Sequence, residues 1–272
     1  MTQLPGPEGS ALRPDDLTGA PYPGAPVAYV EALAEGRPLR APRWGLPDVL
    51  IAILIALVVP SLVLGAVIAG GAARDGGLVL LLSLMLPWLG FGLWPIVTTR
   101  LQGNGPTLDL GLSVRWIDVI WGIGGGVACF VLGTLAASVT EHFVGSFDSA
   151  AGDALASADV SRWVVWAFAV CALVGAPLFE ELCFRGLAFA AIAKSSARRG
   201  LPAVPVATVG SALLFALVHV EPVRIPVLLV IGLVLSVLRA RTGRIGASVI
   251  AHSLNNLVAV FSLLTASTLH WF

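Results

Sequence analysis

Long stretches without ionisable residues dominate this chain. No Asp, Glu, Lys or Arg lies between Asp48 and Arg74, between Asp75 and Arg100, or between Asp118 and Glu141. Each stretch exceeds the roughly 20 apolar residues that cross about 30 Å of hydrocarbon. Further apolar stretches are expected to form helices at about 162–193, 202–219, 224–239 and 245–268. The pattern predicts an all-α, polytopic membrane protein with about seven transmembrane helices.

Composition excludes two other classes of protein. The chain is 57% hydrophobic and only 12% charged, with a mean hydropathy of +0.91. A water-soluble domain of this length would carry about twice that fraction of charge. Sixteen basic residues balance sixteen acidic ones, so a nucleic-acid partner is not expected. The lipid bilayer is the expected environment.

The chain is expected to divide where its composition changes. Residues 1–43 contain the segments PGPEG, APYPGAP and RPLRAPR, which predict a disordered, proline-rich tail. Residues 44–109 are expected to form two membrane helices and their connection, and residues 269–272 a short C-terminal end.

Basic residues predict how the chain lies in the membrane, because cytoplasmic loops carry most of the Lys and Arg. If the amino terminus is cytoplasmic, the outer segments hold only Arg74, Arg162 and Arg224. The sequence therefore predicts a multi-pass protein of the cell membrane with a cytoplasmic N-terminus and an external C-terminus.

Ionisable side chains within the predicted helices are the candidates for function. Each costs about 2.5 to 3.5 kcal/mol to insert into a bilayer. They are accompanied by the amides of Asn255 and Asn256. The set comprises Glu180, Glu181, Arg185, His219 and His252.

Two adjacent carboxylates are expected to have different environments. Glu181 and Arg185 are four residues apart, so they share a helix face and can form an ion pair. Glu180 is turned about 100° away and has no cation on its own helix. One carboxylate is thus neutralised, while the other can accept a proton.

Two further pairs have helical spacing, Phe215 with His219 and His252 with Asn256. A carboxylate base, imidazoles and an amide are the groups that addition of water to a peptide carbonyl requires. No serine lies in a nucleophile-elbow context, and no cysteine has a companion histidine at a recognisable spacing. Direct attack by water is therefore expected, rather than a covalent intermediate.

These motifs, EExxxR, FxxxH and HxxxN in that order, resemble those of the CAAX prenyl protease and bacteriocin-processing family, also called Abi or type II CAAX proteases. The resemblance covers about residues 110–268, which would form an intramembrane protease domain. It implies that Glu180 and His219 activate water, that His252 and Asn256 bind the oxyanion, and that Glu181 and Arg185 support the site. Phe184 and Phe215 are expected to support the site or contact substrate.

The resemblance implies an endopeptidase acting on a membrane peptide or protein, either of CAAX type or a bacteriocin or peptide precursor. A metal-free, glutamate-dependent mechanism is favoured, although Glu180, His219 and His252 could hold a zinc ion with water as the fourth ligand. The alternatives are a non-catalytic immunity or scaffold protein and a small proton-coupled transporter. No oligomeric state follows from the sequence.

Convergence of these groups requires a particular geometry. The 221–224 turn is expected to lie below the outer surface, and Pro202 and Pro205 allow the fifth helix to begin outside the bilayer. Both features would bring His219 towards Glu180 near the midplane. The expected result is a water-filled cavity inside the bundle, closed outward and open inward.

Overall fold

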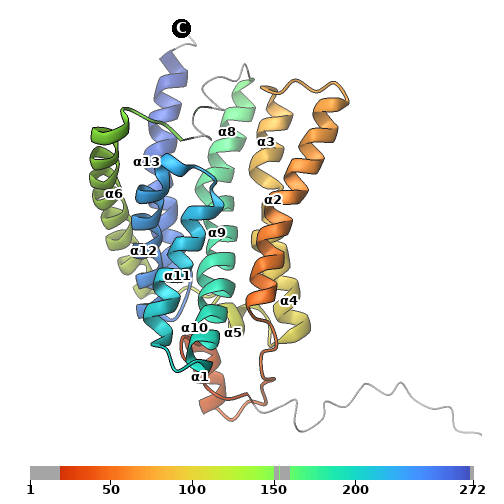
Figure 1. Cartoon of the computed structure of the whole chain (residues 1–272), viewed down its shortest axis with the longest axis vertical. Helices are drawn as coiled ribbons and strands as arrows, with labels where there is room; N and C mark the ends of the chain where they lie inside the picture. The colour runs from red at the N-terminus through yellow and green to blue at the C-terminus, as the bar shows by residue number, and fades with distance from the viewer. Residues whose placement is uncertain (1–18, 150–152, 154–159, 270–272) are drawn as a thin grey trace, which may run out of the picture.

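The computed structural model describes residues 19–149, 153 and 160–269 as an elongated helical bundle (Figure 1). Its first half contains α1 (Val27–Ala34), α2 (Leu46–Ala69), α3 (Gly77–Met85), η2 (Leu89–Leu93), α4 (Trp94–Gln102), α5 (Pro106–Leu110) and α6 (Trp116–Val144). Its second half contains α8 (Arg162–Val170), η3 (Cys171–Gly175), α9 (Ala176–Glu181), η4 (Leu182–Ala188), α10 (Phe189–Arg198), α11 (Ala203–Val218), η5 (Pro222–Arg224), α12 (Ile225–Thr242) and α13 (Gly246–Leu269).

The predicted fold class, a polytopic helical membrane protein, is confirmed. Among the described residues, five helices are long and apolar enough to cross a membrane. They are Leu46–Ala69, Gly77–Gln102, Trp116–Val144, Arg162–Arg198 and Pro222–Thr242. Two apolar helices are shorter, Ala203–Val218 and the Gly246–Phe261 part of α13.

Helix α11 does not form the full span expected at 202–219. It has 16 residues, which corresponds to about 24 Å of helix and is less than the hydrocarbon thickness. The turn that joins α11 to α12 therefore lies below the ends of α2, α8 and α13 (Figure 1). The carboxyl end of α11, which carries His219, is thereby placed inside the bundle.

The segment from α8 to α10 forms the centre of the bundle. Helices α2, α3 and α4 lie on one side of it, and α6, α12 and α13 lie on the other (Figure 1). Helix α6 packs on both α12 and α13, and α11 packs on α10 and α12. The core is most tightly closed around η4, where Leu182, Phe184 and Leu187 are fully buried.

The prediction of a disordered tail over 1–43 is wrong for residues 19–43. This segment contains α1, and Tyr29, Ala32 and Leu39 are almost fully buried. The proline-rich composition does not reveal this packing. The aromatic ring of Tyr22 packs against the rings of both Tyr29 and Trp44. Burial of these rings opposes the loss of chain entropy. Residues 1–18 lie outside the described residues, as do residues 270–272 of the expected C-terminal end.

Polar contacts fix this N-terminal segment beneath the bundle. Lys194 donates a 2.6 Å hydrogen bond to the carbonyl of Trp44, and its ammonium lies 3.4 Å from the centre of that indole ring. The indole in turn donates to the carboxylate of Asp109 at 3.2 Å. Burial raises the pKa of Asp109 above its ordinary value, while hydrogen bonds from Asn104 and Trp44 oppose this shift. The segment thus closes one end of the bundle.

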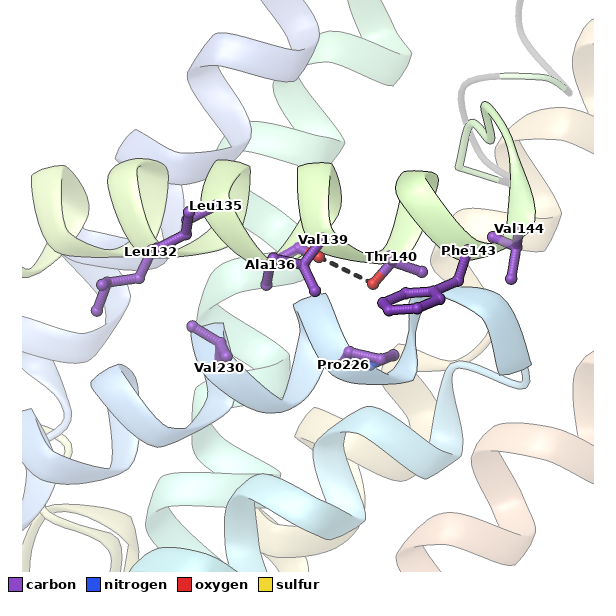
Figure 2. Close-up of a pocket in the computed structure, with 9 residues that line it drawn as sticks. All are labelled: Leu132, Leu135, Ala136, Val139, Thr140, Phe143, Val144, Pro226 and Val230. Carbon is purple, nitrogen blue, oxygen red and sulfur yellow. Dashed lines mark hydrogen bonds between the residues drawn. The ribbon is translucent and has the colours of Figure 1, made fainter.

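An apolar groove of about 480 Å³ runs between α6 and α12 (Figure 2). Leu132, Phe143, Pro226 and Val230 are among the side chains that line it. The hydroxyl of Thr140 donates to the carbonyl of Ala136 in its own helix, so it is not left unpaired on this apolar surface. Such a surface is suited to lipid acyl chains.

Glycine brings α2 and η2 into close contact, and this gives a first prediction. A Cβ atom at Gly90 would overlap the carbonyl oxygen of Ala52, which belongs to the backbone of α2 and cannot move aside. Gly90→Ala is expected to lower the free energy of unfolding by about 1 to 3 kcal/mol through overpacking. Gly65→Ala is the control, because a Cβ atom there meets nothing within 4 Å.

Denaturant unfolding of both purified variants in detergent measures the difference. An equal midpoint for Gly90→Ala and Gly65→Ala would contradict this account of the α2–η2 contact.

Candidate active site

Two π-helical segments flank α9, which carries both adjacent glutamates. Segment η3 (Cys171–Gly175) precedes α9, and η4 (Leu182–Ala188) follows it. Pro177 lies in the first turn of α9 and has no backbone N–H to donate, so the hydrogen bonding of the preceding turn must change. π segments of this kind occur often at functional sites because they alter the direction of side chains.

Glu181 is the centre of a fully buried polar network. Its Oε1 atom accepts hydrogen bonds from Nη1 of Arg185 at 2.8 Å and from Nδ1 of His252 at 3.0 Å. The expected ion pair is therefore present, and it also holds a histidine from α13. Arg185 further donates to the carbonyl of Gly232 at 3.0 Å and lies 4.5 Å from the centre of the Phe215 ring. The network links η4, α9, α11, α12 and α13.

Glu180 has a different environment, as its position on the helix predicts. Its side chain is 17% exposed, and its Oε2 atom is buried without a hydrogen-bond partner among the described residues. This oxygen faces Nε2 of His252 at 3.9 Å, which is too long for a direct hydrogen bond. One oxygen of the Glu180 carboxylate is therefore directed at Nε2 of His252, whose Nδ1 is bonded to Glu181.

His219 reaches the same site from the carboxyl end of α11. Its Nδ1 atom lies 2.7 Å from the carbonyl oxygen of Phe215, so Nδ1 carries the proton and Nε2 is left as the acceptor in the neutral ring. The next residue, Val220, has a φ of 56°. A β-branched residue in the left-handed region is strained, and such strain is common at functional sites.

Asn256 does not pair with His252, although four residues separate them. Its Nδ2 atom donates to the carbonyl of Ala172 in η3 at 3.0 Å. One amide N–H is used in this bond, and the other is left for a further acceptor. The amide is thus oriented by the π segment before α9.

Two phenylalanines hold the histidines in place. The ring of Phe215 contacts the rings of His219 and His252 edge-on, with centroid distances of 4.6 and 5.7 Å. Phe184 packs perpendicular to Phe215 at 5.4 Å and is fully buried. Phe215 lines the cavity described next, whereas Phe184 lies behind it and can act only as a support.

A cavity of about 330 Å³ brings the candidate groups together. Its lining includes Glu180, Phe215, His219, His252, Asn255 and Asn256. Its lining further includes Leu84 near the carboxyl end of α3, Ser149 after α6, Val260 of α13, and Glu221 and Arg224 of the turn between α11 and α12. Its volume is in the range of sites that bind small ligands or short peptide segments.

The expectation of a cavity closed outward and open inward is therefore wrong. The cavity extends towards the end that was expected to be outside, because α11 stops at Val218 and the upper part of the bundle lacks the α11–α12 pair. The opposite end is blocked by the buried side chains of η4 and by the N-terminal segment.

The donor set does not fit a catalytic zinc centre. A site of that type needs three protein ligands around one point. In the part of the chain that the structure describes, no group of three or more His, Cys, Asp or Glu side chains is arranged to hold a metal ion. His252 uses Nδ1 for Glu181, and its Nε2 lies 3.9 Å from Oε2 of Glu180. No step proposed below uses a metal.

The bundle and its buried polar cavity define a multi-pass membrane protein with a hydrolase-like set of side chains. Residues 162–258 match the model of a family described as type II CAAX prenyl endopeptidase Rce1-like. This match confirms, over that segment, the resemblance inferred from the motifs. The matched segment contains every candidate residue named from the sequence. No curated protein and no solved structure matches the chain.

The sequence analysis did not identify several features of the site. It missed the carbonyl of Ala172, the strained Val220 and the Glu221–Arg224 pair, whose atoms lie 2.9 Å apart beside the cavity. Pro177 within an apolar run was the available signal for the irregular helix before α9. No comparable signal in the sequence pointed to Val220.

Proposed function

We propose that this protein is an intramembrane endopeptidase that hydrolyses a peptide bond of a membrane-anchored substrate, with Glu180 as the base that activates water. The observation that carries this proposal is the Oε2 atom of Glu180, which has no hydrogen-bond partner among the described residues and lies 3.9 Å from Nε2 of His252, another residue that lines the cavity. A water molecule can contact both atoms across that distance. The family match supports the assignment to a protease.

In the proposed reaction, Glu180 takes one proton from the water while the water oxygen bonds to the peptide carbonyl carbon. Nε2 of His219 accepts a hydrogen bond from the second O–H of the water, which stays on the oxygen, because Nδ1 of His219 donates to the Phe215 carbonyl. The carbonyl oxygen becomes an oxyanion. When the C–N bond breaks, Glu180 returns its proton to the leaving amine nitrogen.

Two groups are placed to stabilise the oxyanion. Asn256 has one free N–H, since the other is held by Ala172. When both ring nitrogens of His252 carry hydrogen, Nε2 supplies a second donor to the oxyanion while Nδ1 donates to Glu181. Glu181 and Arg185 act as positioning residues, because they fix the His252 ring without reaching the cavity.

The proposal is tested by comparing membrane-derived peptides from cells that carry the native protein or Glu180→Gln. New peptide ends should depend on Glu180. A scaffold or immunity protein would give the same peptides and the same cellular effect with either chain, and that result would reject a protease.

Asn256→Ala gives a test of the oxyanion interaction. Loss of one preorganised donor is expected to lower kcat by about 100- to 1,000-fold, with little change in KM because the donor acts mainly in the transition state. Asn255→Ala is the matched comparison. Its amide also lines the cavity, but its only described hydrogen bond is a 3.5 Å contact to Asn256, so a much smaller loss of kcat is expected. Equal losses of kcat in the two variants would contradict the assignment.

A further inference from the structure

A basic pocket of about 390 Å³ lies where the segment after α1 meets the end of α4 and the loop before α5, at one end of the bundle (Figure 1). Arg37 and Arg40 line it from the segment after α1, and Arg100 lines it from the last turn of α4. Three guanidinium groups therefore share one cavity. All of its lining residues lie outside the segment 162–258 that matches the family model, so the basic pocket is separate from the candidate active site.

The charges of the basic pocket are not neutralised by the part of the chain that the structure describes. Within that part, no carboxylate forms an ion pair with Arg37, Arg40 or Arg100, and their guanidinium groups make no hydrogen bond. Arg115, by contrast, pairs with Glu31 of α1 at 2.8 Å. Like charges around one cavity repel one another unless an anion lies among them. The basic pocket is thus suited to a negatively charged ligand.

Asp109 helps to build the loop beside the basic pocket without neutralising the pocket. Its side chain is fully buried, and Oδ2 accepts hydrogen bonds from the backbone N–H of Asn104 at 2.6 Å and from the indole of Trp44 at 3.2 Å. Asp109 itself does not line the pocket, whereas Asn104 does. The negative charge is therefore used on the inner side of the loop, and the arginines are left for a ligand.

Hydrogen bonds fix the walls of the basic pocket before any ligand binds. The backbone N–H of Arg40 donates to Oδ1 of Asn104 at 2.8 Å, and Nδ2 of Asn104 donates back to the carbonyl of Arg40 at 3.0 Å. Gly105 has a φ of 91°, which favours glycine, and its N–H donates to the carbonyl of Thr99 at 3.1 Å. Walls that are already ordered lower the entropy cost of binding.

The position of the basic pocket along the bundle is that of a membrane surface. The helix Gly77–Gln102 is long and apolar enough to cross a membrane, and Arg100 lies in its last turn. The neighbouring residue Leu101 is 73% exposed, so an apolar side chain lies next to the charged ones. Basic residues at the ends of membrane helices meet the phosphate groups of lipid headgroups.

We propose that the basic pocket binds a phosphate group. Guanidinium groups donate paired hydrogen bonds to phosphate oxygens, in a geometry that lysine does not offer. An anionic phospholipid and a soluble phosphate share this chemistry, and the exposed Leu101 beside the pocket favours the phospholipid. A bound phosphate would join the segment after α1 to the end of α4, and so hold the N-terminal segment against the bundle. This proposal does not depend on the proposed protease.

Binding of dioleoyl phosphatidic acid to the full chain in detergent, counted by native mass spectrometry, is the first arm of the test. The pocket variant is Arg37→Gln with Arg100→Gln. The matched control is Arg198→Gln with Arg241→Gln, which removes two exposed charges outside this pocket. The pocket variant is expected to bind the first lipid at least about tenfold more weakly than the control, because each lost guanidinium removes charge-assisted hydrogen bonds.

Equilibrium dialysis of radiolabelled orthophosphate against the chain in phosphatidylcholine nanodiscs is the second arm. A loss in the pocket variant for phosphatidic acid alone identifies a lipid headgroup as the ligand. A loss for orthophosphate shows that a soluble phosphate is sufficient. Either loss supports the phosphate site, whereas equal binding of both probes by the pocket variant and the control, including no binding, would overturn it.

The pocket variant is expected to fold, because the side chains of Arg37 and Arg100 make no hydrogen bond or ion pair among the described residues. Equal denaturant midpoints for the pocket variant and the control check this. A lower midpoint would be met by measuring Arg100→Gln alone. That variant should bind phosphatidic acid about threefold more weakly than the native chain if the two charges contribute equally, and unchanged binding would again overturn the proposal.

Discussion

Replacing Glu180 with glutamine is expected to lower the rate of peptide hydrolysis by about 100- to 10,000-fold, which is the range for loss of a positioned general base. Glutamine preserves the shape of the side chain but cannot take a proton from water. The Oε2 atom of Glu180 has no hydrogen-bond partner among the described residues, so the substitution breaks no structural contact of that atom. The fold should therefore survive while turnover is lost.

The measurement is the rate of cleavage by purified protein in lipid vesicles, with a peptide identified by the comparison of cells. Glu141→Gln is the control, because it makes the same chemical change at an exposed position near the end of α6. Cleavage at the native rate by Glu180→Gln would remove Glu180 from the mechanism.

Replacing Arg185 with leucine is expected to lower the free energy of unfolding by about 3 to 5 kcal/mol. Arg185 and Glu181 form an ion pair whose two side chains are both 0% exposed. Without the guanidinium, a buried carboxylate keeps only its contact with His252, and the hydrogen bond to Gly232 is also lost. The cost comes from leaving one charge buried and uncompensated.

Arg115→Leu is the matched control for this prediction. Arg115 also pairs with a glutamate at 2.8 Å, but the two side chains are 52% and 47% exposed. An exposed pair contributes at most about 1 kcal/mol. Unfolding of both variants in detergent should give a much larger loss for Arg185→Leu, and equal losses would show that the buried network does not stabilise the bundle.

Much of the bundle follows from the distribution of charge along the chain. Gaps without ionised residues predict the long helices, because the bilayer excludes uncompensated charge. The four-residue spacing of Glu181 and Arg185 also predicts their ion pair, since both partners lie on one helix and no tertiary information is needed.

Contacts between helices could not be predicted in the same way. The spacing of His252 and Asn256 suggests that they meet, yet His252 contacts Glu181 and Asn256 contacts Ala172. Which partner a side chain meets across a helix interface depends on helix rotation, and the π segments on both sides of α9 change that rotation. Helical spacing within one element does not determine it.

The closed end of the bundle was missed for a related reason. Prolines between residues 19 and 43 predict an extended, unpacked chain, but Tyr22, Tyr29 and Trp44 pack together and cover the end of the bundle. The average composition of the segment does not show that three aromatic side chains contact one another in the folded structure. Without this packing, the cavity was expected to open at the end of the bundle that residues 19–43 cover.

A single-turnover reaction in water enriched in oxygen-18 tests the central claim most directly. The account predicts that one oxygen atom from water enters the new carboxyl group of the product, while the Glu180 carboxylate of the native protein gains none and Glu180→Gln forms no product. Mass spectrometry of the product and of the protein segment that contains Glu180 gives both values. Label in the Glu180 carboxylate, or labelled product formed equally fast by Glu180→Gln, would contradict direct activation of water by this residue.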